Sequence, residues 1–339
     1  MRKSLCNVAQ TLAAAAACVL MIGPVHAQFQ EHTIRATLSA SKDHPLGVAL
    51  TKVAQCVAQK SGGKFKIQTF FDGSLGSDVP TIQQLRTGTL DMVVTATSFM
   101  STMVPSAALF DLPFLFANEK EAYAALDGKA GELLAQRLAG VGLVTLAYWE
   151  NGFRNMTNSK RPITRMEDLG GLKMRALQNP IVVETFKAMG GFAVPMPFTE
   201  VYSALETKTV DGQENPVPII ESAKFYEVQK YLSMTRHIYN PGVVVYSKQL
   251  FDKLAPVEQA ALRECAEGAR EEQRRLNRQQ TEEGIVRLKA KGMIVNELSP
   301  AELARMREVA KPIHEKALPT IGAEMVAASN EDLKSVRGR

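Results

Sequence analysis

Strand-like and helix-like segments alternate through most of this chain, and this alternation restricts its fold more than any other feature of the sequence. Residues 33–39 alternate between apolar and polar side chains, as a half-buried strand does, and residues 45–60 follow with the apolar spacing of a helix. The pattern predicts further strands at 65–71, 90–95, 141–149 and 172–176, and further helices at 79–87, 181–189, 258–291 and 300–318. Strands alternating with helices predict a mostly parallel sheet with both faces covered, which is an α/β fold.

The length of the chain predicts two lobes. The chain has 339 residues, whereas single hydrophobic cores stop growing at about 250–300 residues. The sequence has no internal repeat, no low-complexity tract and no long linker. Two packed lobes without a flexible linker imply a hinge, and the cleft beside a hinge is a common site for a small ligand.

The N-terminal segment has the features of a secretory leader. Two basic residues precede an uncharged apolar run over residues 11–22, which is shorter than the roughly 20 residues that a membrane-spanning helix needs. Small residues precede Gln28 at the positions that signal peptidase requires, so we predict a cleaved leader over residues 1–27. A lipoprotein would need Cys18 as its acylated residue, but the alanines before Cys18 do not supply the usual large aliphatic side chain. A retained membrane anchor is disfavoured by the short apolar run.

Loss of that leader leaves two cysteines, Cys56 and Cys265, in an oxidising compartment. The two residues form either one disulfide or two buried thiols, and the sequence leaves both alternatives open. No CxxC pair and no cluster of cysteine and histidine is present, so no metal site is predicted.

Charge and motifs argue against several classes of function. The net charge of +5 is spread along the chain without a basic stripe, so nucleic-acid binding is not expected. The chain has no GxSxG, HExxH, GxxxxGK[ST] or strand-linked GxGxxG motif, so we predict no catalytic residue and no cofactor. A secreted enzyme with an unfamiliar site stays open as an alternative.

Three polar residues stand out in strand ends and turns. Arg175 ends the short strand pattern of residues 171–176, where a guanidinium can present a planar pair of donors to a carboxylate. The competing interpretation of Arg175 is a salt bridge between lobes. Arg154 follows another apolar strand, and Asn215 lies in the turn-forming segment 211–216, where its amide is equally explained by turn formation.

Eight stretches of the sequence form a recognisable set: residues 73–78, 85–91, 111–116, 152–158, 168–175, 197–205, 210–216 and 224–228. Together they resemble the DctP family, the solute-binding proteins of tripartite ATP-independent periplasmic (TRAP) transporters. The resemblance covers nearly all of the chain after the leader, in the right order.

The resemblance implies a fold, a partner and a location. The fold would be a two-lobed type II periplasmic-binding-protein fold with a long helix spanning both lobes. We expect lobe one at residues 28–151 plus 240–280 and lobe two at 152–239 plus 281–339. The protein would be a periplasmic monomer that delivers a small organic acid to TRAP membrane permease subunits. Delivery to an ABC importer or a sensor kinase is the alternative.

The resemblance also assigns roles to residues at one end of the ligand. Arg175 would form the salt bridge to the ligand carboxylate. Arg154 and Asn215 would support the same end, and Phe198 would pack against the ligand.

The distal end of the ligand is less constrained by the resemblance. The loops expected to face it carry His44, Thr95, Thr97, Trp149 and Glu150, although Trp149 is equally a core residue and His44 and Glu150 are equally surface residues. Residues 198–202 and 224–230 are similar to the sialic-acid-binding branch. The lobe-one polar contacts of that branch appear here as Ser39, Ser77 and Ala96, so its acidic contacts are expected to be missing. A sugar acid or hydroxy acid is therefore favoured over both sialate and a plain C4-dicarboxylate.

Overall fold

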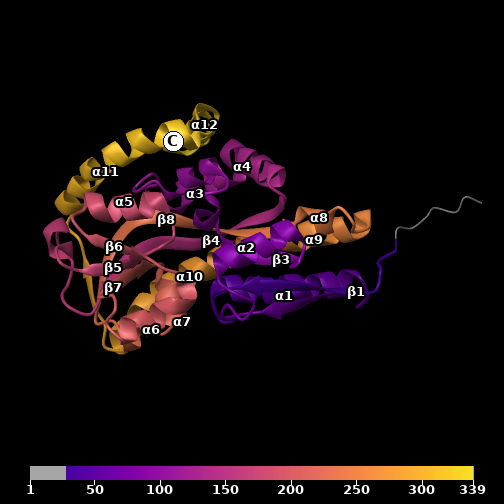
Figure 1. The fold of residues 1–339 in the computed structure, drawn as a ribbon, viewed down its shortest axis with the longest axis horizontal. Coiled ribbons are helices and arrows are strands. Elements are labelled where there is room, and N and C mark those ends of the chain that lie inside the picture. Colours follow the sequence, from indigo (N-terminus) through magenta and orange to yellow (C-terminus); the bar gives the residue numbers. More distant parts are fainter. Residues whose placement is uncertain (1–27, 339) are drawn as a thin grey trace, which may run out of the picture.

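The computed structural model describes residues 28–338, so the predicted leader lies outside the described residues. Its centre is a nine-stranded sheet in the order β2-β1-β3-β8-β4-β7-β5-β6, with β9 paired to β8 (Figure 1). The strands are β1 (His32–Leu38), β2 (Phe65–Phe70), β3 (Met92–Ala96), β4 (Leu143–Asn158), β5 (Lys173–Ala176), β6 (Phe192–Pro195), β7 (Gly212–Asn215), β8 (Tyr231–Ser247) and β9 (Ile294–Glu297). Parallel pairs form both ends of the sheet, and antiparallel pairs join them through β4 and β8.

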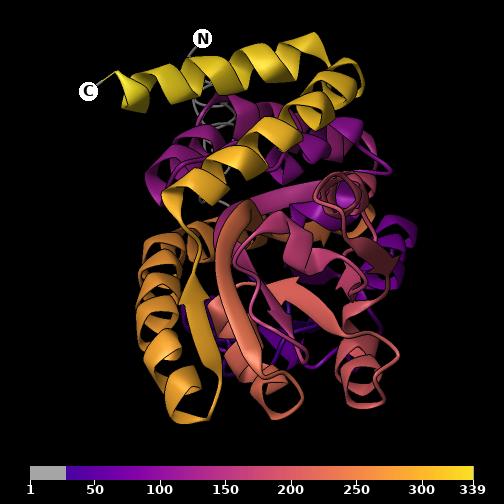
Figure 2. The same ribbon diagram turned by 90° about the vertical axis from the view of Figure 1, so that its left-hand side faces the viewer.

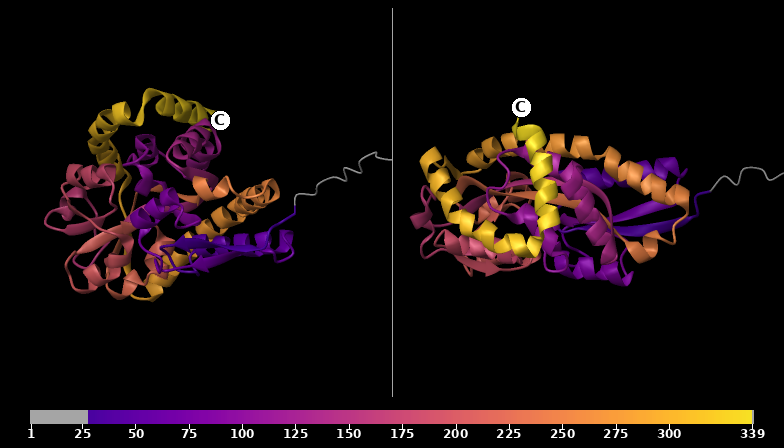
Figure 3. Two further views of the ribbon diagram at one scale, coloured as in Figure 1. Left: turned by 45° about the vertical axis from the view of Figure 1, so that its right-hand side comes forward. Right: turned by 90° about the horizontal axis from the view of Figure 1, so that it is seen from above.

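Helices cover both faces of this sheet, as Figures 1 and 2 show. They are α1 (Pro45–Lys60), α2 (Asp78–Thr87), α3 (Glu119–Asp127), α4 (Lys129–Gly140), α5 (Pro180–Ala188), α6 (Val201–Glu206), α7 (Val217–Ser222), α8 (Lys248–Phe251), α9 (Pro256–Gly268), α10 (Arg270–Ala290), α11 (Pro300–Ile321) and α12 (Ala323–Arg337). Five 3₁₀ turns complete the described part: η1 (Thr97–Met100), η2 (Pro105–Asp111), η3 (Met166–Leu169), η4 (Phe198–Glu200) and η5 (Phe225–Glu227). Helices α11 and α12 arch over one face and pack on η2, α3 and α4 (Figure 3).

The two long central strands tie the ends of the molecule together. β4 and β8 pair antiparallel along nearly their whole length, with a register shift between Glu150 and Gly152. Gly152 sits there at a φ of 111°, a conformation that glycine adopts without steric cost. A bulge of this kind bends a strand locally, so β4 changes direction between the two ends of the sheet.

Alternate residues of the central strands feed two hydrophobic cores, one on each face of the sheet. Val93, Val243 and Val245 belong to one core, whereas Val94 and Val244 belong to the other. All five are almost fully buried. Covered faces explain why these strands read as continuous apolar runs in the sequence.

Most predicted elements are confirmed to within a few residues, and one difference has a clear cause. The stretch 258–291 is two helices, α9 and α10, which meet at Ala269. Its charged pattern is continuous, so periodicity alone does not reveal the break. Helix α10 packs on β4 and contacts both α1 and α7, as expected of a long helix that spans both lobes. Among residues 28–338, no helix has the length and apolar character needed to cross a membrane.

The structure decides between the two states that the sequence left open for the cysteines. Cys56 of α1 and Cys265 of α9 form a disulfide, with their Cα atoms 5.8 Å apart. The bond links two helices through cysteines that are 209 residues apart in sequence. The two helices also pack against each other, so the disulfide joins neighbouring helices at one end of the sheet.

Candidate functional site

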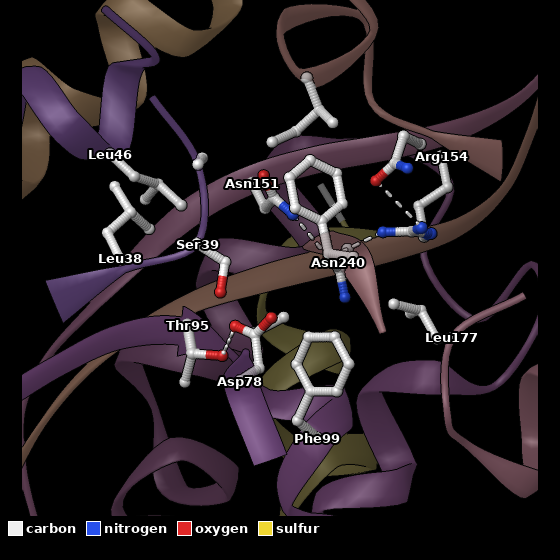
Figure 4. A pocket seen from close by; sticks show the side chains of 15 residues that line it. Leu38, Ser39, Leu46, Asp78, Thr95, Phe99, Asn151, Arg154, Leu177 and Asn240 are labelled. Atoms are coloured by element: carbon white, nitrogen blue, oxygen red, sulfur yellow. Dashed lines mark hydrogen bonds between the residues drawn. The ribbon is translucent and has the colours of Figure 1, made fainter. Parts of the chain in front are cut away.

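A small cavity of about 50 Å³ lies where the carboxyl ends of β1 and β3 face β4, β7 and β8 (Figure 4). Both ends of the sheet contribute to its wall. The lining residues are Leu38, Ser39, Ala40, Leu46, Asp78, Thr95, Ala96, Phe99, Asn151, Arg154, Leu177, Phe198, Asn215, Ile219 and Asn240.

One wall of the cavity carries a buried acid, Asp78, at the first residue of α2. Its Oδ1 accepts a hydrogen bond from the Thr95 hydroxyl at 2.6 Å, and both side chains are almost fully buried. Burial raises the pKa of the Asp78 carboxyl, and the bond from Thr95 partly opposes that rise. An acid therefore lines the cavity one residue after Ser77, where the sequence had not led us to expect one.

The opposite wall is built around Arg154 of β4, which is 1% exposed. Its guanidinium donates to both carboxylate oxygens of Glu214, to Asn215 Oδ1 at 3.1 Å and to Asn240 Oδ1 at 3.1 Å. Burial alone would raise the pKa of Glu214, but Arg154 and a contact from His237 hold it at about 2. Glu214 is therefore ionised at any physiological pH, and it neutralises one guanidinium.

Arg175 ends β5 beside the same wall and is fully buried. Its Nε and Nη2 donate to the Met196 carbonyl at 3.0 and 2.7 Å. Within residues 28–338 its Nη1 has no hydrogen-bond partner and its guanidinium has no ion pair. The side chain is not part of the cavity lining, yet its charge interacts with Arg154, Glu214 and Asp78. Burial and the neighbouring Arg154 lower the pKa of Arg175 to about 10.

Two further predicted residues also line the cavity. Phe198 is half-buried at the start of η4 and packs near Phe225, with ring centroids 6.1 Å apart. Thr95 is the partner of Asp78 described above. The structure thus gathers Arg154, Asn215, Phe198 and Thr95 around one cavity, and the charge of Arg175 interacts with that of Arg154.

Trp149 and Glu150 lie elsewhere. Trp149 is fully buried in the core, and its Nε1 donates to the Ala266 carbonyl at 3.0 Å. Glu150 accepts a bond from the Tyr123 hydroxyl, and its backbone N–H donates to Gln273 of α10 at 2.8 Å. Burial raises the pKa of Glu150 to about 7. Both side chains are occupied by packing on helices rather than directed at the cavity.

His44 and Thr97 are also absent from the lining. His44 caps α1 by accepting from the Leu46 N–H at 3.2 Å, and burial lowers its pKa to about 3. Thr97 starts η1 and is fully buried. Each follows a loop that reaches the cavity rim, which is why sequence position alone placed it near the ligand.

The sequence did not single out two amides that line the cavity, Asn151 and Asn240. Asn151 Nδ2 donates to Asn240 Oδ1 at 2.8 Å, which joins the two long strands beside the bulge. The sequence feature that could have revealed them is a polar residue within an otherwise apolar strand pattern. In residues 28–338, no group of three histidine, cysteine, aspartate or glutamate side chains is placed to hold a metal ion.

Comparison with known proteins identifies the family of this chain. The family model described as "Bacterial extracellular solute-binding protein, family 7" (DctP) matches residues 37–319. The sugar acid binding protein DctPAm from Advenella mimigardefordensis, solved with galactonate, is 41% identical, with a TM-score of 0.89 over 91% of this chain and 99% of that one. A TRAP periplasmic solute-binding protein from Polaromonas, bound to D-erythronate, is 36% identical, with a TM-score of 0.84 over 88% of this chain and 98% of that one.

A curated relative leads to the same family. The 2,3-diketo-L-gulonate-binding periplasmic protein YiaO of Escherichia coli is 41% identical over 73% of this chain and 76% of its own length. The two-lobed α/β fold expected from the sequence is therefore confirmed. This chain belongs to the DctP family of bacterial extracellular solute-binding proteins, the solute-binding components of TRAP transporters.

Proposed function

We propose that this protein captures a sugar acid or related hydroxy acid in the cavity, without changing it, and delivers it to a TRAP permease. The observation that carries the proposal is an imbalance of charge at one wall. Two buried guanidinium groups, Arg154 and Arg175, lie close enough for their charges to interact, and Glu214 is the only carboxylate bonded to either within the described residues. A second anion is therefore favoured at this wall.

The carboxylate of the ligand is the anion that we assign to this position. Nη1 of Arg175 is a buried donor without a partner in residues 28–338, and such a group costs free energy until an acceptor reaches it. Arg154 and Asn215 line the adjacent cavity wall. Hydrogen bonds to charged groups contribute about 1.5–3 kcal/mol each, so several convergent donors would offset the desolvation of a carboxylate.

The remainder of the ligand would extend toward Asp78. A buried carboxylate with one bond from Thr95 retains free acceptor positions, which suit the hydroxyl groups of a sugar acid. A second carboxylate at this end would lie beside Asp78, and two carboxyl groups that share a buried site cannot both ionise without a large cost in free energy. This geometry supports a hydroxylated monocarboxylate over a C4-dicarboxylate, as do the galactonate and D-erythronate bound by the similar proteins.

Thermal unfolding with a panel of carboxylates tests this assignment. We expect D-galactonate or D-erythronate to raise the unfolding midpoint by several degrees, since a ligand at 100 times its Kd adds about 2.7 kcal/mol to the free energy of unfolding. Succinate should give a much smaller shift, and galactitol, which lacks the carboxylate, should give none. A shift for succinate equal to that for the sugar acids would overturn the preference. After long incubation we expect to recover the ligand unaltered, which distinguishes a binding protein from an enzyme.

We also propose the lobe boundaries expected from the sequence, residues 28–151 plus 240–280 and 152–239 plus 281–339. The bulge of β4 at Gly152, paired with Asn240 of β8, supports a hinge at both crossings. Because both lobes line the cavity, ligand binding should favour a closed form. Small-angle scattering that is identical with and without ligand would contradict this closure.

The export of the chain and its transport partner complete the proposal. Cleavage after Ala27 would place the mature protein in the periplasm, as in the family. We expect mass spectrometry of periplasmic protein to find Gln28 at the N-terminus, whereas an intact Met1 or an acylated Cys18 would contradict export by this route. Uptake of the ligand by cells that carry only the cognate TRAP permease would separate this partner from an ABC importer.

A further inference from the structure

Behind the arginine wall lies a second buried polar network, centred on Asp111 at the end of η2. The Asp111 side chain is fully buried. Its Oδ1 accepts a hydrogen bond from the Ser98 hydroxyl, and its Oδ2 accepts one from Asn179 Nδ2 at 2.7 Å. Within residues 28–338 Asp111 forms no salt bridge. A buried carboxylate that only neutral donors satisfy is unusual, and its place in the fold suggests a use.

One arm of this network leads to the cavity. Ser98 Oγ accepts from Asn240 Nδ2 at 2.8 Å. Asn240 Oδ1 in turn accepts from Arg154 Nη1 at 3.1 Å and from Asn151 Nδ2 at 2.8 Å. Asn240, Arg154 and Asn151 all line the cavity (Figure 4). An unbroken chain of hydrogen bonds therefore connects Asp111 to the guanidinium of Arg154.

The charge state of Asp111 determines which group donates and which accepts in each hydrogen bond of this series. An ionised Asp111 can only accept, so the Ser98 hydroxyl must donate to it. The lone pairs of Ser98 are then left for the amide NH₂ of Asn240, which turns the carbonyl of Asn240 toward Arg154. Without that constraint, the Ser98 hydroxyl can donate to Asn240 instead. The Asn240 amide then flips and presents its NH₂ to a guanidinium, where donor faces donor.

The other arm leads to the loop that follows Arg175. Asn179 Nδ2 donates to Asp111, to the Ser98 carbonyl at 3.0 Å and to Ser101 Oγ at 3.1 Å. Its Oδ1 accepts from the Ile181 N–H at 2.9 Å and caps α5. Only three residues separate Asn179 from Arg175. Asp111 therefore also fixes the loop between β5 and α5.

We propose that Asp111 is a positioning residue for ligand capture, which acts through Ser98 and Asn240 on Arg154 and through Asn179 on the loop after Arg175. The inference rests on the proposed function, because it assumes that the arginines receive the ligand carboxylate. Ionised Asp111 holds the carboxylate-binding wall in its receptive arrangement, and protonated Asp111 releases it. In the protonated form the acid donates to Ser98, which frees the Ser98 hydroxyl to reverse Asn240.

Proton uptake by Asp111 occurs at a relevant pH. Burial raises the pKa of Asp111 to about 7, although the bonds from Ser98 and Asn179 oppose the rise. Affinity should therefore be greater at pH 8 than at pH 6, because the ionised form is the one that orders the wall. The other ionisable groups around this segment are Arg154 of β4, Glu214 of β7, His237 of β8, Glu184 of α5, and His314 and Lys316 of α11.

Calorimetric titration of the leaderless protein with D-galactonate at pH 8 and pH 6 tests the proposal. Asp111→Asn and Ser98→Ala should each weaken binding about ten- to hundredfold at pH 8, the loss typical of one charged hydrogen bond. The double variant should lose no more than the worse single variant, because both changes interrupt one relay. Asp111→Asn should also remove the weakening of wild-type binding at pH 6, which separates Asp111 from the other ionisable groups.

A matched control distinguishes positioning from packing. Ser106 lies on the same 3₁₀ turn as Asp111, is 2% exposed, and its hydroxyl has no partner among the described residues. Ser106→Ala should bind D-galactonate as the wild type does. Asp111→Asn with wild-type affinity and an unchanged pH profile would overturn the inference while leaving the proposed function intact. Wild-type protein that binds none of the sugar acids would instead contradict both the inference about Asp111 and the proposed function.

Discussion

Replacing Arg175 with methionine should weaken the binding of a sugar acid by about 2–5 kcal/mol, as removal of one partner of a buried charge pair does. Arg175→Lys retains the charge but loses the planar pair of donors. A lysine cannot bond to the Met196 carbonyl and the ligand in the same geometry, because Nε and Nη2 hold that carbonyl while Nη1 stays free. We expect its affinity to fall at least about tenfold, or 1.4 kcal/mol.

The stability of the ligand-free protein separates this role from a structural salt bridge. Arg175 has no ion pair within residues 28–338, and burial holds its pKa near 10, below its ordinary value. The folded chain then binds this proton less readily than the unfolded chain, so the charged guanidinium opposes folding at pH values below about 10. Arg175→Met should therefore leave the free energy of unfolding at pH 7 unchanged or raised.

Calorimetric titration and chemical denaturation of each variant check both expectations. Arg275→Ala is the matched control, because Arg275 is an exposed arginine of α10 whose only side-chain hydrogen bond among residues 28–338 is to Gln279. It removes the same charge and should alter neither affinity nor stability. A destabilised Arg175→Met protein with near-native affinity would assign Arg175 to the fold instead of the ligand.

Loss of the disulfide is the second large effect that we expect. Replacing Cys56 and Cys265 together with alanine should lower the free energy of unfolding by about 2–5 kcal/mol, the usual contribution of a native disulfide. The crosslink spans 209 residues of sequence, and a long loop loses more conformational freedom in the unfolded chain when it is closed. Affinity for the ligand should change little, because neither cysteine lines the cavity.

Denaturant unfolding with and without a reductant measures this contribution. The reductant should destabilise the wild-type protein to the level of the double variant and leave the variant unaffected. Each single alanine variant should match the double variant, since one cysteine alone cannot form the bond. Equal unfolding midpoints for oxidised and reduced wild-type protein would show that the helices pack equally well without it.

Those helices and short strands that the sequence predicted could be recognised because each has one consistent period of apolar residues. α1 was predicted with its observed bounds, since Pro45 opens it and apolar residues recur at helical spacing. β4 was only half predicted. Beyond Trp149 it carries Asn151, Arg154 and Asn155, all buried by tertiary contacts, so the residues that form the site interrupt the pattern that reveals the strand.

The residues of the site were likewise predicted only in part. The resemblance to a family pointed to Arg154, Asn215 and Phe198, which the structure gathers at one cavity. Sequence position could not separate Glu150 from Asn151, because a bulge decides which of these neighbours faces the cavity. Asp78 looked like an ordinary acid in the first turn of a helix, where negative charge is favourable anyway, and only the fold brings it opposite the arginines.

The most direct test of this mechanism is a crystal structure of the leaderless protein with D-galactonate. We expect one carboxylate oxygen to lie about 2.7–2.9 Å from Nη1 of Arg175, with Arg154 and Asn215 beside the same carboxylate and a ligand hydroxyl bonded to Asp78. A carboxylate bound at Asp78 and Thr95, or a ligand outside the cavity with Arg175 Nη1 still unpaired, would contradict it.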